Sequence, residues 1–82
     1  MAAPPNKREI LKNILNEIEP GWWIEKPSPA DPYDIHSCLC IFRKPSENKR
    51  AEAWIPNSLL WEKGIAQVKQ IVIAAIRNAK AP

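Results

Sequence analysis

The chain has 82 residues, a formal net charge of +3 and a hydrophobic fraction of 45%. That length allows a single domain, in which roughly 60% of the unfolded chain's surface can be buried. The hydrophobic fraction is too high for a disordered protein. The mild positive charge permits contact with nucleic acid or with an acidic surface but does not require it.

Targeting and membrane segments are not predicted. The opening residues, "MAAPPNKREI", are too polar for a signal peptide. The longest apolar run, "IVIAAI", is far shorter than the ~20 residues of a membrane-spanning helix. The two cysteines are too few for a disulfide framework. We therefore expect a soluble, cytoplasmic protein that does not contact membranes.

The first predicted element is a helix over about residues 7–19. Residues 1–5 are expected to be a disordered lead, and residues 6–80 a single small domain. Asn6 followed by Glu9 has the spacing of a capping box. An apolar stripe at helical spacing follows, and Pro20 and Gly21 end the helix. The stripe consists of Ile10, Leu11, Ile14, Leu15 and Ile18.

Three strands are predicted next. Residues 22–26 form a short aromatic strand, and residues 27–34 carry three prolines and are irregular. Residues 35–43 are long, apolar and free of Gly and Pro, which is typical of a central strand. A turn over 44–48 leads to an antiparallel strand over 49–55, in which alternate residues share a face. Ala51, Ala53 and Ile55 lie on one face, and Arg50, Glu52 and Trp54 on the other.

The last predicted element is a helix from about Ile65 to Ala79. Residues 58–63 are either a separate helical turn or part of that helix, because Gly64 either closes or merely interrupts it. The order α-β-β-β-α predicts a two-layer α+β fold, with a three-stranded antiparallel sheet and both helices packed on one face. The other face of the sheet then lacks a cover within the chain.

The tryptophans are the first candidates for function. Trp22 and Trp23 are adjacent, so in a regular strand they point to opposite faces of the sheet. An apolar patch on the uncovered face is expected to mark a partner surface or a base-stacking platform, unless loop 27–34 or a second copy covers it. The protein-interface candidates are Trp22, Trp23, Trp54 and Trp61.

Basic residues form a second set of candidates. Four cluster at the predicted hairpin and three lie on the outer face of the last helix, where clustered cations can contact phosphates. The alternative is an ordinary solvated hairpin end and helix face. The nucleic-acid candidates are Arg43, Lys44, Lys49, Arg50, Lys69, Arg77 and Lys80.

The only histidine and both cysteines fall at alternating positions, His36, Cys38 and Cys40. On a regular strand these side chains share a face, as metal ligands must. Their Cα atoms would be spaced ~6.6 Å apart, which suits Zn–S bonds of ~2.3 Å poorly. We therefore interpret the cysteines as small buried residues of the central strand, and keep a metal or redox site as a minority hypothesis.

Catalysis is not expected. The sequence lacks an oriented nucleophile and base, and two glycines are too few for the usual phosphate-binding loop. Neither a cofactor nor a small-molecule substrate is indicated. We predict a small non-catalytic interaction module that binds a protein partner, or itself as a homodimer, through an aromatic sheet face. The alternative is a nucleic-acid-binding accessory protein that uses the basic hairpin and the outer face of the last helix.

The order α-β-β-β-α and the length resemble those of a double-stranded-RNA-binding domain, over most of the chain. The resemblance implies a last helix packed on an antiparallel sheet and contact with RNA phosphates. That family opens its second helix with a dense lysine cluster. The corresponding stretch here, "EKGIAQVKQ", holds only Lys63 and Lys69.

Overall fold

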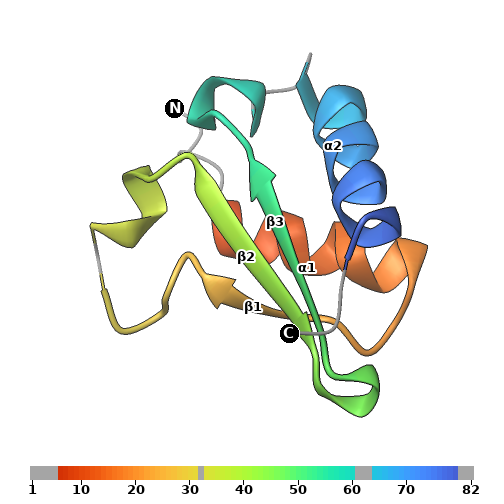
Figure 1. Cartoon of the computed structure of the whole chain (residues 1–82). Helices are drawn as coiled ribbons and strands as arrows, with labels where there is room; N and C mark the ends of the chain where they lie inside the picture. The colour runs from red at the N-terminus through yellow and green to blue at the C-terminus, as the bar shows by residue number, and fades with distance from the viewer. Residues whose placement is uncertain (1–5, 32, 61–63, 80–82) are drawn as a thin grey trace.

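The computed structural model describes residues 6–31, 33–60 and 64–79. Two helices and three strands follow each other in the order α-β-β-β-α, with three short 3-10 helices between them (Figure 1). The predicted lead over residues 1–5 lies outside the described part of the chain. The elements are α1 (Lys7–Ile18), β1 (Trp23–Lys26), η1 (Asp34–His36), β2 (Leu39–Lys44), η2 (Pro45–Glu47), β3 (Lys49–Trp54), η3 (Asn57–Leu60) and α2 (Ile65–Arg77).

The three strands form one antiparallel sheet in the order β1-β2-β3. β2 and β3 are joined by η2 and by Asn48, which takes the left-handed conformation that asparagine tolerates. Their register pairs Lys44 with Lys49 next to the turn and Leu39 with Trp54 at the other end. β1 is shorter, and its pairing with β2 is irregular between Ile24 and Lys26.

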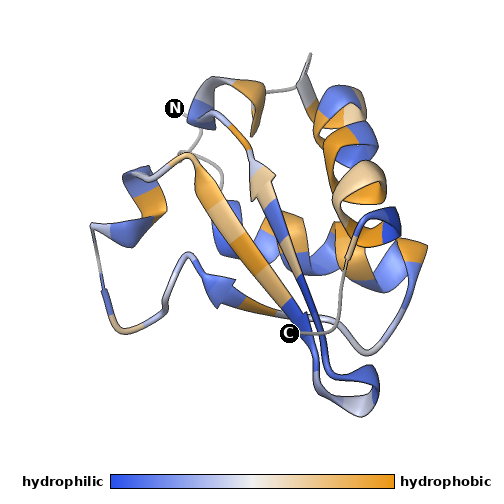
Figure 2. Ribbon diagram, viewed as in Figure 1, coloured by the Kyte–Doolittle hydropathy of each residue, from blue (hydrophilic) through white to orange (hydrophobic). Residues whose placement is uncertain are grey.

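Both helices pack on one face of the sheet, as predicted. α1 contacts β1, and α2 contacts β3 and η3. Hydrophobic residues run along β2 and α2, whereas the tip of the β2–β3 hairpin is hydrophilic (Figure 2). The core lies between the sheet and the helices and includes Leu11, Ile14, Leu15, Trp22, Ile24, Cys40, Phe42, Ala51, Ala53, Ile55, Leu60, Val68 and Val72.

The N-terminus of α1 is held by two sets of polar contacts. The backbone N–H of Glu9 donates to the side chain of Asn6, which confirms the predicted N-cap. Lys7 is only 4% exposed, although lysine is rarely buried. Its ammonium group donates to the carbonyl oxygens of Ser37 and Ile55 and to Oδ1 of Asn57. α1 is thereby fastened to the segment before β2 and to the segment after β3.

The start of the central strand differs from the prediction. β2 begins at Leu39 rather than at residue 35, because residues 34–36 turn into η1. The Asp34 carboxylate accepts the backbone N–H of Ser28, and the N–H of Ser37 donates to the Asp34 carbonyl. These local bonds give the backbone an alternative to strand pairing. Apolar composition alone therefore placed the strand boundary wrongly.

Gly64 directly precedes α2, at a point where the backbone passes close to Leu59 of η3. A Cβ atom at this position would overlap the Leu59 carbonyl group, so only glycine permits this close approach. η3 ends at Leu60, and α2 begins at Ile65. Residues 61–63, the remainder of the predicted helical turn, lie outside the described residues.

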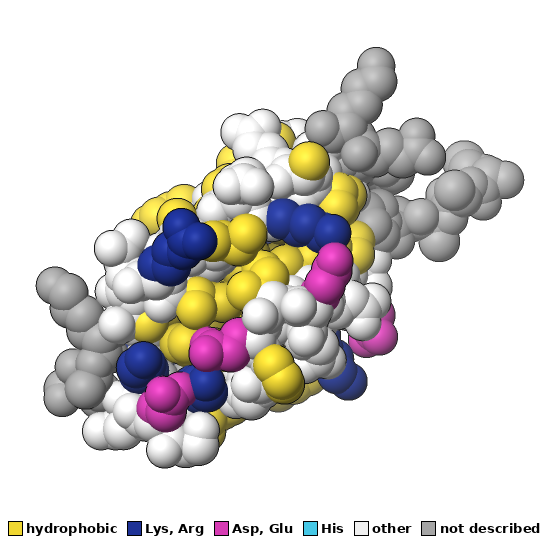
Figure 3. Space-filling view, turned by 90° about the vertical axis from the view of Figure 1, so that its right-hand side faces the viewer, with side chains coloured by type: hydrophobic (Ala, Val, Ile, Leu, Met, Phe, Trp, Pro, Cys, Tyr) yellow, Lys and Arg dark blue, Asp and Glu magenta, His cyan; other side chains and the backbone are white. Residues whose placement is uncertain are grey.

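A groove of about 610 Å³ runs between β3 and α2. It is lined by backbone and side chains of β3 and by Ile71, Ala74, Ala75 and Asn78 of α2. On the side of the molecule that carries α2, apolar side chains gather in a hollowed band bordered by charged side chains (Figure 3). No helix among residues 6–31, 33–60 and 64–79 is long and apolar enough to cross a membrane.

Candidate interaction surface

The face of the sheet turned away from the helices is called the open face here. Alternate residues of each strand point to it. β3 shows the alternation most clearly: Ala51 and Ala53 are buried against the helices, whereas Glu52 and Trp54 are exposed. The open face consists of Trp23, Glu25, Lys26, Leu39, Ile41, Arg43, Arg50, Glu52 and Trp54.

Two tryptophans stand at the open face. Trp54 is 67% exposed and Trp23 is 47% exposed, which are high values for the largest apolar side chain. Trp54 lies opposite the half-buried Leu39 in the register of β2 and β3. Ile35 and Tyr33, in the segment that precedes β2, are also exposed. Both residues lie outside the strands and are not part of the open face.

Ile41 lies at the centre of the open face. It belongs to the middle strand, between Lys26 of β1 and Glu52 of β3, and is 6% exposed. It does not belong to the core between sheet and helices. The open face thus carries an apolar centre that is largely shielded from water.

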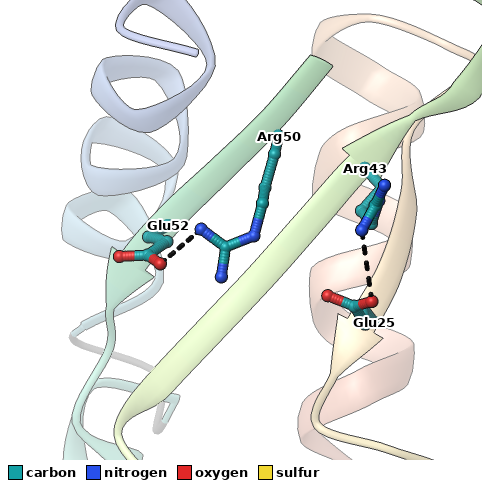
Figure 4. A network of polar contacts seen from close by, with 4 residues as sticks. All are labelled: Glu25, Arg43, Arg50 and Glu52. Carbon is teal, nitrogen blue, oxygen red and sulfur yellow. Dashed lines mark hydrogen bonds and ion pairs between the residues drawn. The ribbon is translucent and has the colours of Figure 1, made fainter. Parts of the chain in front are cut away.

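Four of the five charges of the open face neutralise one another in pairs. Arg43 and Arg50 stand directly opposite each other on β2 and β3, a like-charge arrangement that is unfavourable alone. Arg43 lies 3.5 Å from Glu25, and Arg50 is hydrogen-bonded to Glu52 (Figure 4). With Lys26 opposite Ile41, the face holds three cations and two anions, so it offers a net charge of only +1 to a partner.

The other cations of the hairpin are also engaged with carboxylates. The Lys44 side chain is 12% exposed and its ammonium group contacts Glu19 at 3.2 Å and Glu47. Lys49 lies 3.8 Å from Glu47. On α2, Lys69 pairs with Glu17 of α1. Arg77 is exposed at the end of α2, and Lys80 lies outside the described residues.

These contacts shift the pKa values of three side chains, Glu19, Lys44 and Glu47. The Trp22 indole N–H donates to Glu19, and this bond, together with the one from Lys44, lowers the pKa of the Glu19 carboxyl. The bond from Lys44 also lowers the pKa of Glu47, and in return Glu47 and Glu19 raise the pKa of Lys44. Lys44 therefore joins the end of α1 to the hairpin.

The tryptophan candidates separate into core and surface. Trp22 is 6% exposed and packs in the core, while Trp23 points to the open face. Trp22 and Trp23 point to opposite faces of the sheet, as predicted. Among the described residues, Trp23 and Trp54 therefore remain as candidates for an interface. Trp61 lies outside the described residues.

His36, Cys38 and Cys40 do not share a strand face. His36 is exposed in η1, Cys38 is exposed before β2, and Cys40 is fully buried in β2. Both cysteines are free thiols, and burial raises the pKa of Cys40 to about 11. In the part of the chain that the structure describes, no three His, Cys, Asp or Glu side chains gather closely enough to hold a metal ion.

Comparison with family models, with curated proteins and with solved structures finds no match to this chain. The resemblance to double-stranded-RNA-binding domains therefore consists of the observed order of elements alone. The open face with its two exposed tryptophans is the strongest candidate site in the described residues.

Proposed function

We propose that this protein is a small non-catalytic interaction module that binds a protein surface through the open face of its sheet. The observation that carries this proposal is the exposure of Trp23 and Trp54 on a face that neither helix covers. Large exposed apolar side chains on one face usually mark a partner surface, and tryptophan is enriched among residues that dominate binding energy.

The chemistry of the face indicates the kind of partner. The tryptophans supply large apolar contacts. Arg43 is paired with Glu25 and Arg50 with Glu52, which leaves the single positive charge of Lys26 on the face. A partner with an apolar patch and a polar rim fits this surface better than a strongly charged one. The bound surface belongs to another protein or to a second copy of this chain placed face to face.

Capture and titration test the proposal. The tagged full chain, Trp54→Ser, Trp23→Ser and the control Tyr33→Ser are used to capture proteins from native cell extract. Each captured protein is then purified and titrated against every variant. Tyr33 is 80% exposed but lies outside the strands, which makes it a matched control.

We expect each tryptophan variant to weaken binding at least about tenfold, which corresponds to a loss of about 1.4 kcal/mol. Tyr33→Ser should change the affinity little. Equal affinity of the wild type and both tryptophan variants, with all proteins folded by circular dichroism, would show that the open face is not the binding surface. A face-to-face dimer would instead appear as self-association that both tryptophan variants weaken.

Nucleic-acid binding is the second candidate. The hairpin places Arg43 opposite Arg50 and Lys44 opposite Lys49, which concentrates cations at one end of the sheet and supports this candidate. The neighbouring carboxylates Glu25, Glu47 and Glu52 reduce the net charge available to phosphates. The open-face proposal is therefore the one that the geometry supports better.

Salt dependence separates the two candidates. Labelled single- and double-stranded RNA and DNA are titrated with the chain at ~50 mM salt and at higher concentrations. Phosphate binding weakens steeply with salt, because each neutralised phosphate releases counterions. Absence of binding at low salt would eliminate the nucleic-acid candidate. Tight binding that Lys49→Glu weakens, in the absence of a protein partner, would favour it over the open-face proposal.

A further inference from the structure

β3 is an edge strand whose outer side faces the groove beside α2. Just beyond β3, the Ile55 N–H donates to the carbonyl of Cys38, the residue before β2, which continues the ladder between the two strands. In an antiparallel pair, residues that bond the partner alternate with residues whose N–H and C=O point away. The backbone groups of Arg50, Glu52 and Trp54 therefore point outward. Among residues 6–31, 33–60 and 64–79, we find no hydrogen bond to them.

The opposite edge of the sheet is closed. β1 has four residues, its pairing is irregular after Ile24, and Pro27 follows it. The Arg8 guanidinium, from α1, donates to the carbonyls of Ile24 at 3.0 Å and of Pro27 at 2.7 Å. Irregular, short and covered edges prevent pairing with further strands. β3, with six residues in regular register, lacks each of these protections.

The groove leaves room for a further strand beside β3. On the helix side of the sheet β3 lines the groove with Ala51 and Ala53, and Lys49 stands on the same side at the hairpin end; α2 presents Ala74 and Ala75 to the groove. An added strand with the same sequence would place the methyl groups of Ala51 and Ala53 beneath α2 and its Lys49 side chain opposite Ala53. Small residues allow this close approach, and Figure 3 shows the hollowed apolar band on this side of the molecule.

We propose that β3 pairs antiparallel with β3 of a second copy of this chain, which joins the two sheets into one of six strands. The proposed register places Ala51 opposite Ala51 of the second copy and Arg50 opposite Glu52 of the second copy. This register pairs outward-facing backbone groups with each other, as an antiparallel ladder requires. The contact is two-fold symmetric and closes at two chains.

Charge selects this register over its neighbour. On the β2 side Arg50 faces Arg43, and within its own chain it already bonds Glu52. A further anion on its outer side adds to the relief of the like-charge contact. The second copy's Glu52 supplies that anion, and the symmetry supplies the same contact twice. A shift of two residues would instead place Glu52 opposite Glu52, with like charges at the centre. The proposal uses the strand edge and does not rest on the proposed function of the open face.

Sedimentation equilibrium on two charge variants and their mixture tests the proposal. Arg50→Glu alone places two carboxylates opposite each other in the proposed register, and Glu52→Lys alone places two cations opposite each other, so each variant repels itself. In a pair made of one variant and the other, every contact joins opposite charges. We expect each single variant to weaken dimerisation about tenfold or more, and the mixture to return to within about threefold of the wild type.

Trp23→Ser is the control, because Trp23 lies on β1, at the far side of the sheet from the β3 edge. It should leave the dimer intact while weakening partner capture, which separates this proposal from the proposed function. Circular dichroism establishes that each variant folds. A folded wild type that sediments as a monomer at ~100 μM, or a mixture no tighter than the single variants, would overturn the proposal.

Discussion

At the scale of single residues, Lys7 is buried and contributes hydrogen bonds to the interior of the protein. Its ammonium group satisfies the Ser37 and Ile55 carbonyls and the Asn57 side chain. Lys7→Met keeps much of the side-chain volume but leaves these acceptors without their donor. Since each unsatisfied buried group costs about 1–3 kcal/mol, we expect a loss of about 2–4 kcal/mol in the free energy of unfolding.

Urea denaturation measures this loss, with Lys12→Met as the control. Lys12 is an exposed residue of the same helix, so its replacement should change the free energy of unfolding by less than about 0.5 kcal/mol. Equal stability of both variants would mean that the Lys7 bonds contribute nothing net to folding.

The sequence indicates on which face of α1 Lys7 lies, but not which groups it contacts. Lys7 precedes Leu11 by four residues and Ile14 by seven, which places it on the apolar stripe of α1. Its acceptors lie between 30 and 50 residues away, and helical spacing says nothing about contacts at that separation. The same limit hid the pairing of Arg43 with Glu25.

At the scale of elements, Lys44 links the end of α1 with the β2–β3 hairpin through Glu19 and Glu47. The pKa of both carboxyls lies below the ordinary value of 4.5. Their contribution to stability is therefore present above that pH and is lost as the pH falls through the lowered pKa values. The pKa of Lys44 lies above 10.5, so its contribution is lost at still higher pH.

Lys44→Met should make the free energy of unfolding less dependent on pH, both at acidic and at alkaline pH. We expect the wild type to lose more of its free energy of unfolding than the variant does between about pH 6 and about pH 3, and again above about pH 10.5. Trp22 still bonds Glu19 in the variant, so a smaller acid limb remains. Urea denaturation across pH measures the profile. Parallel curves for wild type and variant would contradict the role of Lys44.

The helices and β3 were predicted to within about two residues because periodicity and caps define them locally. The helix ends at Ile18 and Arg77 differ little from the expected ends at 19 and 79. β2 was predicted less well. Residues 35–38 have strand composition, but the Asp34 side chain and local carbonyls hold them in a turn. Such local competition is decided by geometry that composition does not contain.

At the scale of the whole molecule, tryptophans on the two sides of the sheet should differ in their effect on folding. Trp22 is part of the core, and Trp22→Ala should cost about 3–5 kcal/mol. The double variant Trp23→Ser/Trp54→Ser removes exposed side chains and should stay within about 1 kcal/mol of the wild type. Chemical denaturation of the three proteins measures this difference. A large loss in the double variant would make the open face part of the stabilising core.

The sequence established that Trp22 and Trp23 oppose each other but not which of them enters the core. That choice depends on the side of the sheet that the helices cover, and so on contacts between α1 and β1. Which residues form the exposed face depends likewise on the side of the sheet that the helices cover. The candidate surface was therefore predictable as a set of residues, whereas its orientation required the three-dimensional arrangement.

Arg8 has a consequence for how large an assembly of this chain can grow. A sheet with two available edges adds chains at both ends and propagates into a filament. Here the Ile24 carbonyl of β1 and the Pro27 carbonyl just after it are already bonded to a guanidinium from the chain's own helix. In the proposed pairing, growth through β3 would therefore end after one addition, and Arg8 would act together with the short, irregular β1 to keep the pair closed.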